Sequence, residues 1–241
     1  MYDLTKFTMR DMTECGAALR KLGSGATSME ETASRIVGYL YDHLIDQQTG
    51  AKACALVRFY KTHPYEGLDA DLREFACGLL GEQPTSPALK CLTLLTTIGE
   101  KPEWNSRANS AGHKAIPLPS EQVVTQLPMI AQLVKQFGLE INMVLEPDPN
   151  FLMDLAQTTY NVFYIPEAVG SPYVPAQEEF VIPSAIKSVL SFGGMLPSGH
   201  LFAIILFSKV HIPRETADMF KTVALSAKMA VLPFGEESVF A

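Results

Sequence analysis

Two stretches near the N-terminus carry apolar residues at the spacing of an α-helix. One runs through residues 4–22 and is followed by Gly23, a typical helix stop. The other covers residues 29–44, and Thr27 and Ser28 before it can each cap a helix. The pattern therefore predicts two amphipathic helices ahead of the first strand.

Short apolar runs bounded by turn residues predict the strands. They occupy residues 53–60, 91–98, 161–166, 180–183, 188–196 and 201–210. The last two flank the turn residues 197–200, so we expect them to form a hairpin. Further helices are expected at residues 68–80, 120–137 and 213–231. Pro128 should kink the second of these, and the polar residues 100–119 predict a long loop.

This order of elements predicts an α/β (α+β) fold with a central, mainly antiparallel sheet flanked by helices and an extra N-terminal helix. The chain of 241 residues can bury a substantial core. We expect residues 1–26 to form an N-terminal helical extension, residues 27–234 to form one domain, and residues 235–241 to form a C-terminal tail.

Segments at both ends of this domain resemble GAF domains. TSMEETASRIVGYLYDHLIDQQTGAKACALVRFY (residues 27–60) is similar to the opening helix and first strand of that family, and AIKSVLSFGGMLPSGHLFAIILFSKVHIPRETADMFKTVALSAKMAV (residues 185–231) is similar to its end. Residues 112–234, which include GHKAIPLPS, NVFYIPEAVGSPYVPAQEEFVIP and FGGMLPSG, resemble sensory regions upstream of PAS and histidine-kinase modules in bacteria.

The resemblance implies a GAF-like sensory domain of bacterial signal transduction and not an enzyme. Such a domain binds a small molecule or a partner and relays the signal through its terminal helices, here residues 213–231. A homodimer and a histidine-kinase or other signalling partner are the expected associations. The chain lacks the Asn-Lys-Phe-Asp-Glu set of cyclic-nucleotide relatives and the Cys-His pair of bilin-attaching relatives. The ligand or cofactor therefore stays unknown.

Five residues are candidates for ligand binding: Arg107, His113, Tyr164, Gln177 and Phe192. The first two lie in the predicted loop, where cationic groups can clamp an anion. The aromatic side chains suit a flat organic ligand, and the amide can orient one. The alternatives are a solvated loop for Arg107, His113 and Gln177 and core packing for the two aromatic residues.

Charge and composition narrow the choice of partners. The net charge is −7, and Lys and Arg do not cluster, so we expect neither nucleic acid nor a membrane surface. The first residues contain no apolar run leading to a small-residue cleavage site, which favours a cytoplasmic protein. The five histidines are dispersed and give no metal motif.

Two other functions remain open at this point. One is a dimerisation or interaction module without a ligand. The other is a thiol-dependent reductase of GAF fold that uses Cys54, Cys77 and Cys91, although Cys54 begins an apolar strand and is expected to be buried. A G-x-S-x-G nucleophile motif is missing from the sequence, and we assign no catalytic residue.

Overall fold

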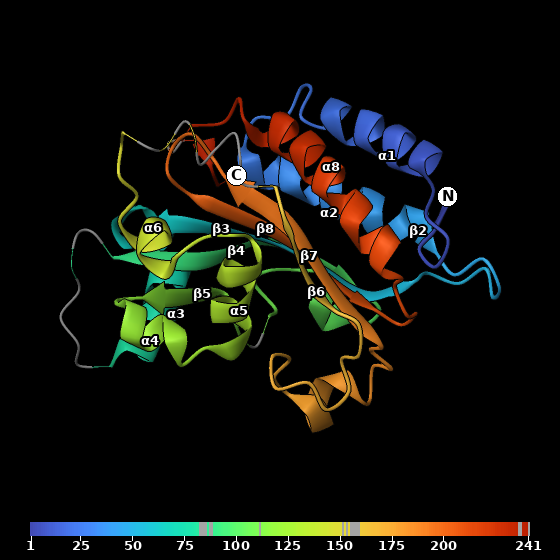
Figure 1. Cartoon of the computed structure of the whole chain (residues 1–241). Coiled ribbons are helices and arrows are strands. Elements are labelled where there is room, and N and C mark those ends of the chain that lie inside the picture. The colour runs from blue at the N-terminus through green and yellow to red at the C-terminus, as the bar shows by residue number, and fades with distance from the viewer. Residues whose placement is uncertain are drawn as a thin grey trace.

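A six-stranded antiparallel sheet forms the centre of the computed structural model, in the order β5-β4-β3-β8-β7-β6 (Figure 1). Its strands are β3 (Cys54–Pro64), β4 (Lys90–Gly99), β5 (Ala115–Leu118), β6 (Val162–Ile165), β7 (Ser188–Met195) and β8 (Leu201–Ser208). A short parallel pair joins β1 (Tyr2–Asp3) to β2 (Leu44–Ile45). The structure describes residues 1–81, 86, 89–110, 112–150, 152, 154, 160–235 and 238–240. The predicted mixed fold, a central antiparallel sheet flanked by helices, is confirmed.

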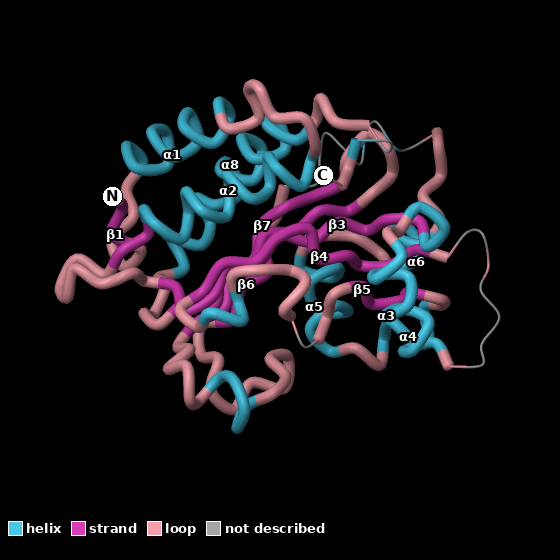
Figure 2. Tube along the Cα trace, turned by 180° about the vertical axis from the view of Figure 1, so that it is seen from behind, coloured by secondary structure: helices cyan, strands magenta, loops and turns pink. Residues whose placement is uncertain are grey.

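Three long helices lie on one side of this sheet, which we call the helix face; two of them contact the strands, and the N-terminal one packs against the C-terminal one (Figures 1 and 2). They are α1 (Met9–Lys21), α2 (Met29–His43) and α8 (Arg214–Val231). Thr8 starts α1 through a capping box with Asp11. Of the two predicted caps of α2, Ser28 takes the position, and its hydroxyl accepts a hydrogen bond of 3.0 Å from the N–H of Glu31. The sequence therefore sets both helix starts locally.

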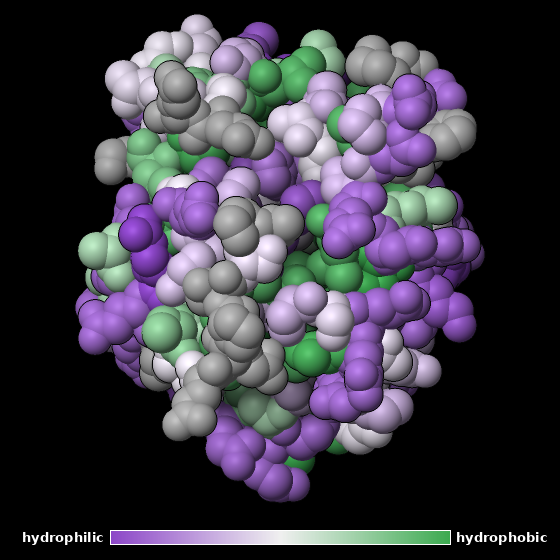
Figure 3. Space-filling model, turned by 90° about the vertical axis from the view of Figure 1, so that its left-hand side faces the viewer, coloured by the Kyte–Doolittle hydropathy of each residue, from purple (hydrophilic) through white to green (hydrophobic). Residues whose placement is uncertain are grey.

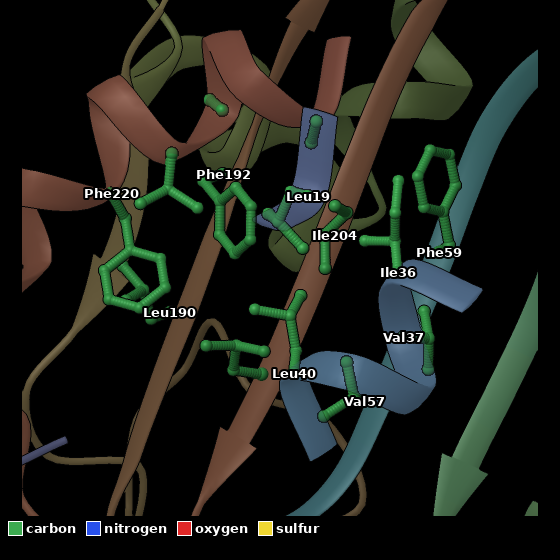
Figure 4. Packing of buried hydrophobic residues seen from close by; sticks show 14 of the residues in the cluster. Leu19, Ile36, Val37, Leu40, Val57, Phe59, Leu190, Phe192, Ile204 and Phe220 are labelled. Atoms are coloured by element: carbon green, nitrogen blue, oxygen red, sulfur yellow. The ribbon is translucent and has the colours of Figure 1, made fainter. Parts of the chain in front are cut away.

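The core beneath these helices is closely packed (Figure 4). Phe192 from β7 points toward Phe220 of α8, and the two ring centroids are 5.1 Å apart. The backbone of α1 lies close to α8, since a Cβ at Gly16 would come within 2.7 Å of the Ser226 hydroxyl oxygen. The N-terminal helix is thus joined to the same core as the terminal helix.

Shorter elements cover the opposite face, which we call the cavity face. They are α4 (Glu121–Thr125), α5 (Pro128–Gln136), α6 (Ile141–Leu145) and the segment 174–180, which runs into a turn of π-helix. The helix α3 (Ala70–Leu80) packs beside the edge strand β5. Single turns of 3₁₀-helix, η1 (Tyr65–Gly67) and η2 (Pro102–Trp104), follow β3 and β4.

Strand alternation divides the apolar residues between the two faces. On β3, Val57 and Phe59 join the core of the helix face, whereas Leu56 and Tyr60 join that of the cavity face. The strand β8 is sorted in the same way, since Ile204 faces the helices and Ile205 faces away from them. Both central strands are therefore buried on both sides.

A β-bulge interrupts the alternation in β4. Phe59 of β3 pairs with Thr96, and the next pair already involves Leu94, so Leu95 is an extra residue in the strand. Leu95 and Thr96 both turn to the helix face: Leu95 joins its core, and the Ser34 hydroxyl of α2 donates a hydrogen bond of 3.1 Å to Thr96 Oγ1.

The strand predicted at residues 180–183 is wrong. Residues 180 and 181 belong to a turn of π-helix, η3 (Gln177–Val181), and residues 182 and 183 follow it. The N–H of Ile182 bonds to the carbonyl of Gln177 five residues earlier, which is the π pattern. A run of four residues ending in Pro183 could not extend a ladder, because proline lacks the N–H that pairing requires.

Two further expectations need correction. The predicted loop 100–119 contains the edge strand β5, whose residues pair with β4. The predicted helix 120–137 is two helices, α4 and α5, with Pro128 as the first residue of the second. Pro128 has no N–H, and its ring crowds the carbonyl of the preceding turn, so the helix stops and restarts. The predicted tail 235–241 lies partly outside the described residues.

Candidate functional site

A cavity of about 340 Å³ lies between the cavity face of the sheet and the short elements that cover it. Its floor consists of strand residues, and its cover consists of side chains from α4, α5, α6 and the segment 174–180. The floor residues are Leu56, Arg58, Tyr60 and Thr62 of β3, Leu92 of β4, and Leu201, Ala203, Ile205 and Phe207 of β8. The lining is almost entirely apolar, and its volume is that of a pocket for a small organic molecule.

Hydrophobic side chains reach the surface near this cover. On the side of the molecule where α3, α4 and α6 lie, hydrophobic atoms are visible between hydrophilic ones (Figure 3). The covering helices have 5, 9 and 5 residues, and helices this short depend on packing for their stability. The cover can therefore open locally more easily than the three-helix layer on the other face.

Arg58 is the charged residue in the cavity floor. Its Nη1 donates a hydrogen bond of 3.2 Å to the hydroxyl of Tyr60, and its Nη2 donates one of 3.5 Å to the hydroxyl of Ser110. The Nε atom is buried and has no hydrogen-bond partner. Among the residues that the structure describes, no carboxylate forms an ion pair with Arg58. One apolar cavity thus contains one guanidinium with unused hydrogen-bonding capacity.

His113 lines the cavity near this guanidinium. Burial, together with the positive charge of Arg58, lowers the pKa of the imidazole below its ordinary value. The residue has a φ of 61°, and Ala176, which also lines the cavity, has a φ of 57°. Left-handed backbone at residues other than glycine costs energy and is concentrated at functional sites.

Aromatic side chains close one side of the cavity. Trp104 and Phe180 meet edge to face with ring centroids 5.5 Å apart, and Phe180 meets Phe207 in the same way at 5.0 Å. Lys101 places its ammonium group 4.8 Å from the centroid of Trp104, on a ring that also lines the cavity. Trp104 is the single tryptophan of the chain, so its fluorescence reports on this wall.

Of the five predicted ligand-binding residues, His113 lines the cavity. Gln177 supports the cavity wall from behind. Its Nε2 donates hydrogen bonds to the carbonyls of Val174 at 2.8 Å and Ala168 at 3.0 Å, and its Oε1 accepts one from the N–H of Gly170 at 2.9 Å. These bonds fix the segment that supplies Val174 and Ala176 to the lining.

Arg107 lies on the same loop as His113 but points away from the cavity. Its Nη2 is 3.3 Å from a carboxylate oxygen of Asp69 and 3.4 Å from one of Glu30 on α2. Its guanidinium also lies 5.3 Å from the ring centroid of Phe240. Arg107 therefore connects the loop to α2 and to the C-terminal residues.

Tyr164 and Phe192 lie on the helix face, where they are part of the packing. The Tyr164 hydroxyl donates a hydrogen bond to the carbonyl of Ile212, just before α8. Phe192 is fully buried against Phe220. The sequence shows that an aromatic residue is in a strand, but the face it occupies depends on register with neighbouring strands.

Most lining residues were not predicted from the sequence, among them Arg58, Trp104 and Phe207. The signal for Arg58 was present, since a single charge interrupts the apolar run CALVRFY of a strand that is buried on both faces. Trp104 carried no comparable signal, because residues from an irregular loop reach the cavity only through the fold.

Burial argues against thiol chemistry at Cys54 and Cys91. Both side chains are fully buried, and burial raises the pKa of each thiol to about 12. Reactive cysteines instead have a lowered pKa and access to solvent. Cys77 is exposed on α3.

Within the described part of the chain, no three His, Cys, Asp or Glu side chains come close enough to hold a metal ion. No helix in the same residues has the length and apolar character needed to cross a bilayer. No family model, curated protein or solved structure matches this chain. The candidate site is therefore defined by its geometry.

Proposed function

We propose that this chain is a cytoplasmic, GAF-like sensory domain of a signalling protein and that it binds an apolar small molecule in the cavity. The cavity of about 340 Å³ carries the proposal, because it combines an apolar lining with a few polar groups at one side. A cavity of about 150 Å³ with similar walls admits benzene, so this one admits a molecule about twice that size.

Two routes connect the cavity to the terminal helices. Strands β3 and β8 line the cavity with one face and support α2 and α8 with the other. The loop after β4 supplies Trp104 and His113 to the cavity and, through Arg107, contacts Glu30 of α2. Phe240 packs near the same arginine, and the Val239 carbonyl accepts a hydrogen bond of 2.8 Å from the N–H of Glu30.

In this proposal, ligand binding changes the position of this loop. The change is passed to α2, to α8 and to a histidine kinase or other signalling partner. For this to happen, the loop must have two arrangements in equilibrium, and the ligand must bind one of them more tightly.

The binding step is tested by titrating decan-1-ol, a neutral apolar probe, while the fluorescence of Trp104 is recorded. We expect saturable binding to the wild-type protein. Ala203→Leu adds a side chain to the cavity floor and should weaken binding at least about tenfold, since overfilling a site costs about 1–3 kcal/mol. Met9→Ala on the exposed side of α1 is the control and should bind normally. Unsaturable binding, or equal binding by Ala203→Leu, would contradict the proposal.

One observation favours a second function, a homodimeric interaction module. Leu225 and Met229 on α8 and Leu232, which caps its C-terminal end, form an exposed row and are 42%, 51% and 43% exposed. Positions four and three residues apart share one side of a helix, so they offer a continuous apolar strip to a second copy. Sedimentation analysis decides this: a dimer that Met229→Lys converts to a monomer supports the module, and a monomeric wild-type protein removes it.

A further inference from the structure

The wall of the cavity contains a positive charge, that of Arg58, with which no carboxylate of the described residues forms an ion pair. Arg107 is 3.3 Å from Asp69, and Arg35 forms an ion pair of 2.5 Å with Glu31. Arg58 is held by two hydroxyl groups, and its Nε is buried without a partner. Arg58 is half-buried. A guanidinium that loses part of its water is stabilised chiefly by an anion, and here no described residue forms an ion pair with it.

The rest of the cavity defines the body of the missing partner. Leu56, Ile205 and Phe207 on the floor and Leu133 on the cover offer apolar contact on opposite sides. A molecule that fills this space must be largely apolar, because it would otherwise bury polar groups without hydrogen bonds.

The charge of the partner follows from the other polar groups at this side. Besides Arg58, these are the hydroxyls of Tyr60 and Thr62 and the imidazole of His113. Burial, together with the charge of Arg58, lowers the pKa of His113, which favours the neutral imidazole in the empty protein. One fixed positive charge balances one negative charge. A guanidinium also has two parallel N–H donors that match the two oxygens of a carboxylate.

We propose that the cavity binds a medium-sized apolar carboxylic acid in its ionised form, with the carboxylate on Arg58 and the apolar part between the floor and the covering helices. This inference rests on the proposed function, because it assigns a ligand class to the same cavity. Arg58 is then the residue that distinguishes an acid from a neutral molecule of the same shape.

The test compares decanoate with decan-1-ol, which have the same chain length and differ in charge. Binding to wild-type protein, Arg58→Gln and Arg58→Lys is measured by Trp104 fluorescence and by calorimetry. We expect the wild-type protein to bind decanoate at least about tenfold more tightly than decan-1-ol, since a hydrogen bond between two charged groups is stronger than one to a neutral hydroxyl. Arg58→Gln should lose the preference and bind decanoate no more tightly than decan-1-ol, because the carboxylate then enters the cavity without a cation. Arg58→Lys should keep part of the preference.

Controls separate this inference from the function on which it rests. Arg10→Gln removes the same charge from the exposed side of α1 and should leave the preference for decanoate unchanged. Equal affinity of the wild-type protein for both probes, or a preference that survives in Arg58→Gln, overturns the carboxylate assignment while the cavity remains a binding site. Failure of both probes to bind the wild-type protein would instead contradict the proposed function. The wild-type comparison alone decides the inference even where a variant fails to fold.

Discussion

The two faces of the central sheet receive alternate residues of the same strands but are covered in different ways. Helices of 15 and 18 residues close the helix face, where Phe192 and Phe220 are in contact, and a helix of 13 residues packs against the longer of the two. Helices of 5, 9 and 5 residues and the segment 174–180 close the cavity face. Long amphipathic helices bury a continuous stripe, whereas short elements meet the sheet at fewer points. The difference indicates that one face stabilises the fold and the other leaves space for a ligand.

Neighbouring isoleucines on β8 provide the strongest test of this difference. Ile204 is fully buried on the helix face, and Ile205 lines the cavity. Truncation to alanine costs about 2–5 kcal/mol in protein cores, depending on how many contacts are lost. We expect Ile204→Ala to lower the free energy of unfolding by about 3–5 kcal/mol and Ile205→Ala by about 2–3 kcal/mol, measured by urea denaturation. Equal losses would show that the two faces are packed alike.

Arg107 tests whether the two faces are independent, because it joins a loop of the cavity face to α2. Its side chain is only 17% exposed, so its ion pairs lie between surface and buried pairs in strength. We expect Arg107→Gln to cost about 1–3 kcal/mol of stability and to speed hydrogen exchange in residues 238–240 and at the start of α2. Arg10→Gln, at an exposed pair, should change neither quantity appreciably. Unchanged exchange in Arg107→Gln would remove the loop as a connection between the faces.

The pH dependence of ligand binding gives the smallest expected effect. In the empty protein, burial and then the charge of Arg58 hold the pKa of His113 below the ordinary value of a histidine. A carboxylate bound beside Arg58 favours the imidazolium, so the pKa of His113 is higher in the complex than in the empty protein. Between these two pKa values binding takes up a proton, and the affinity for decanoate rises as the pH falls through that window. Above the higher pKa, the affinity is constant.

The affinity for decanoate should rise about tenfold for each unit by which the bound anion raises the pKa of His113. Titrations between pH 8 and pH 6 keep decanoate ionised, because carboxyl groups have pKa values of about 4. His113→Gln should abolish the dependence. A weaker affinity at lower pH, or the same rise in His113→Gln, would contradict this account.

The sequence predicted the helix face better than the cavity face, for a physical reason. Helices α2 and α8 carry local signals, namely the Ser28 cap and a stripe of helical period, so their limits could be predicted closely. The segment 177–181 forms a π-helix because Gln177 binds backbone groups of the preceding segment, a tertiary arrangement that composition does not encode. The resemblance to GAF domains stays a hypothesis.

The residues of the candidate site could likewise be predicted where the signal is local and not where it depends on the tertiary structure. His113 could be identified because polar residues in a loop are candidates for binding. Phe192 was assigned to the ligand because the pattern gives alternation without specifying the face. Arg58 is the instructive omission, since a charge within a doubly buried strand requires either a partner or a function.

The bulge in β4 also determines where the chain tolerates a change of length. Removing Leu95 would restore regular alternation and leave all other residues of β4 on their present faces, at the loss of one buried leucine. Removing Thr93 would turn the residues on one side of the deletion to the opposite face, including those that line the cavity. Insertions and deletions among homologous chains are therefore expected at the bulge and not elsewhere in this strand.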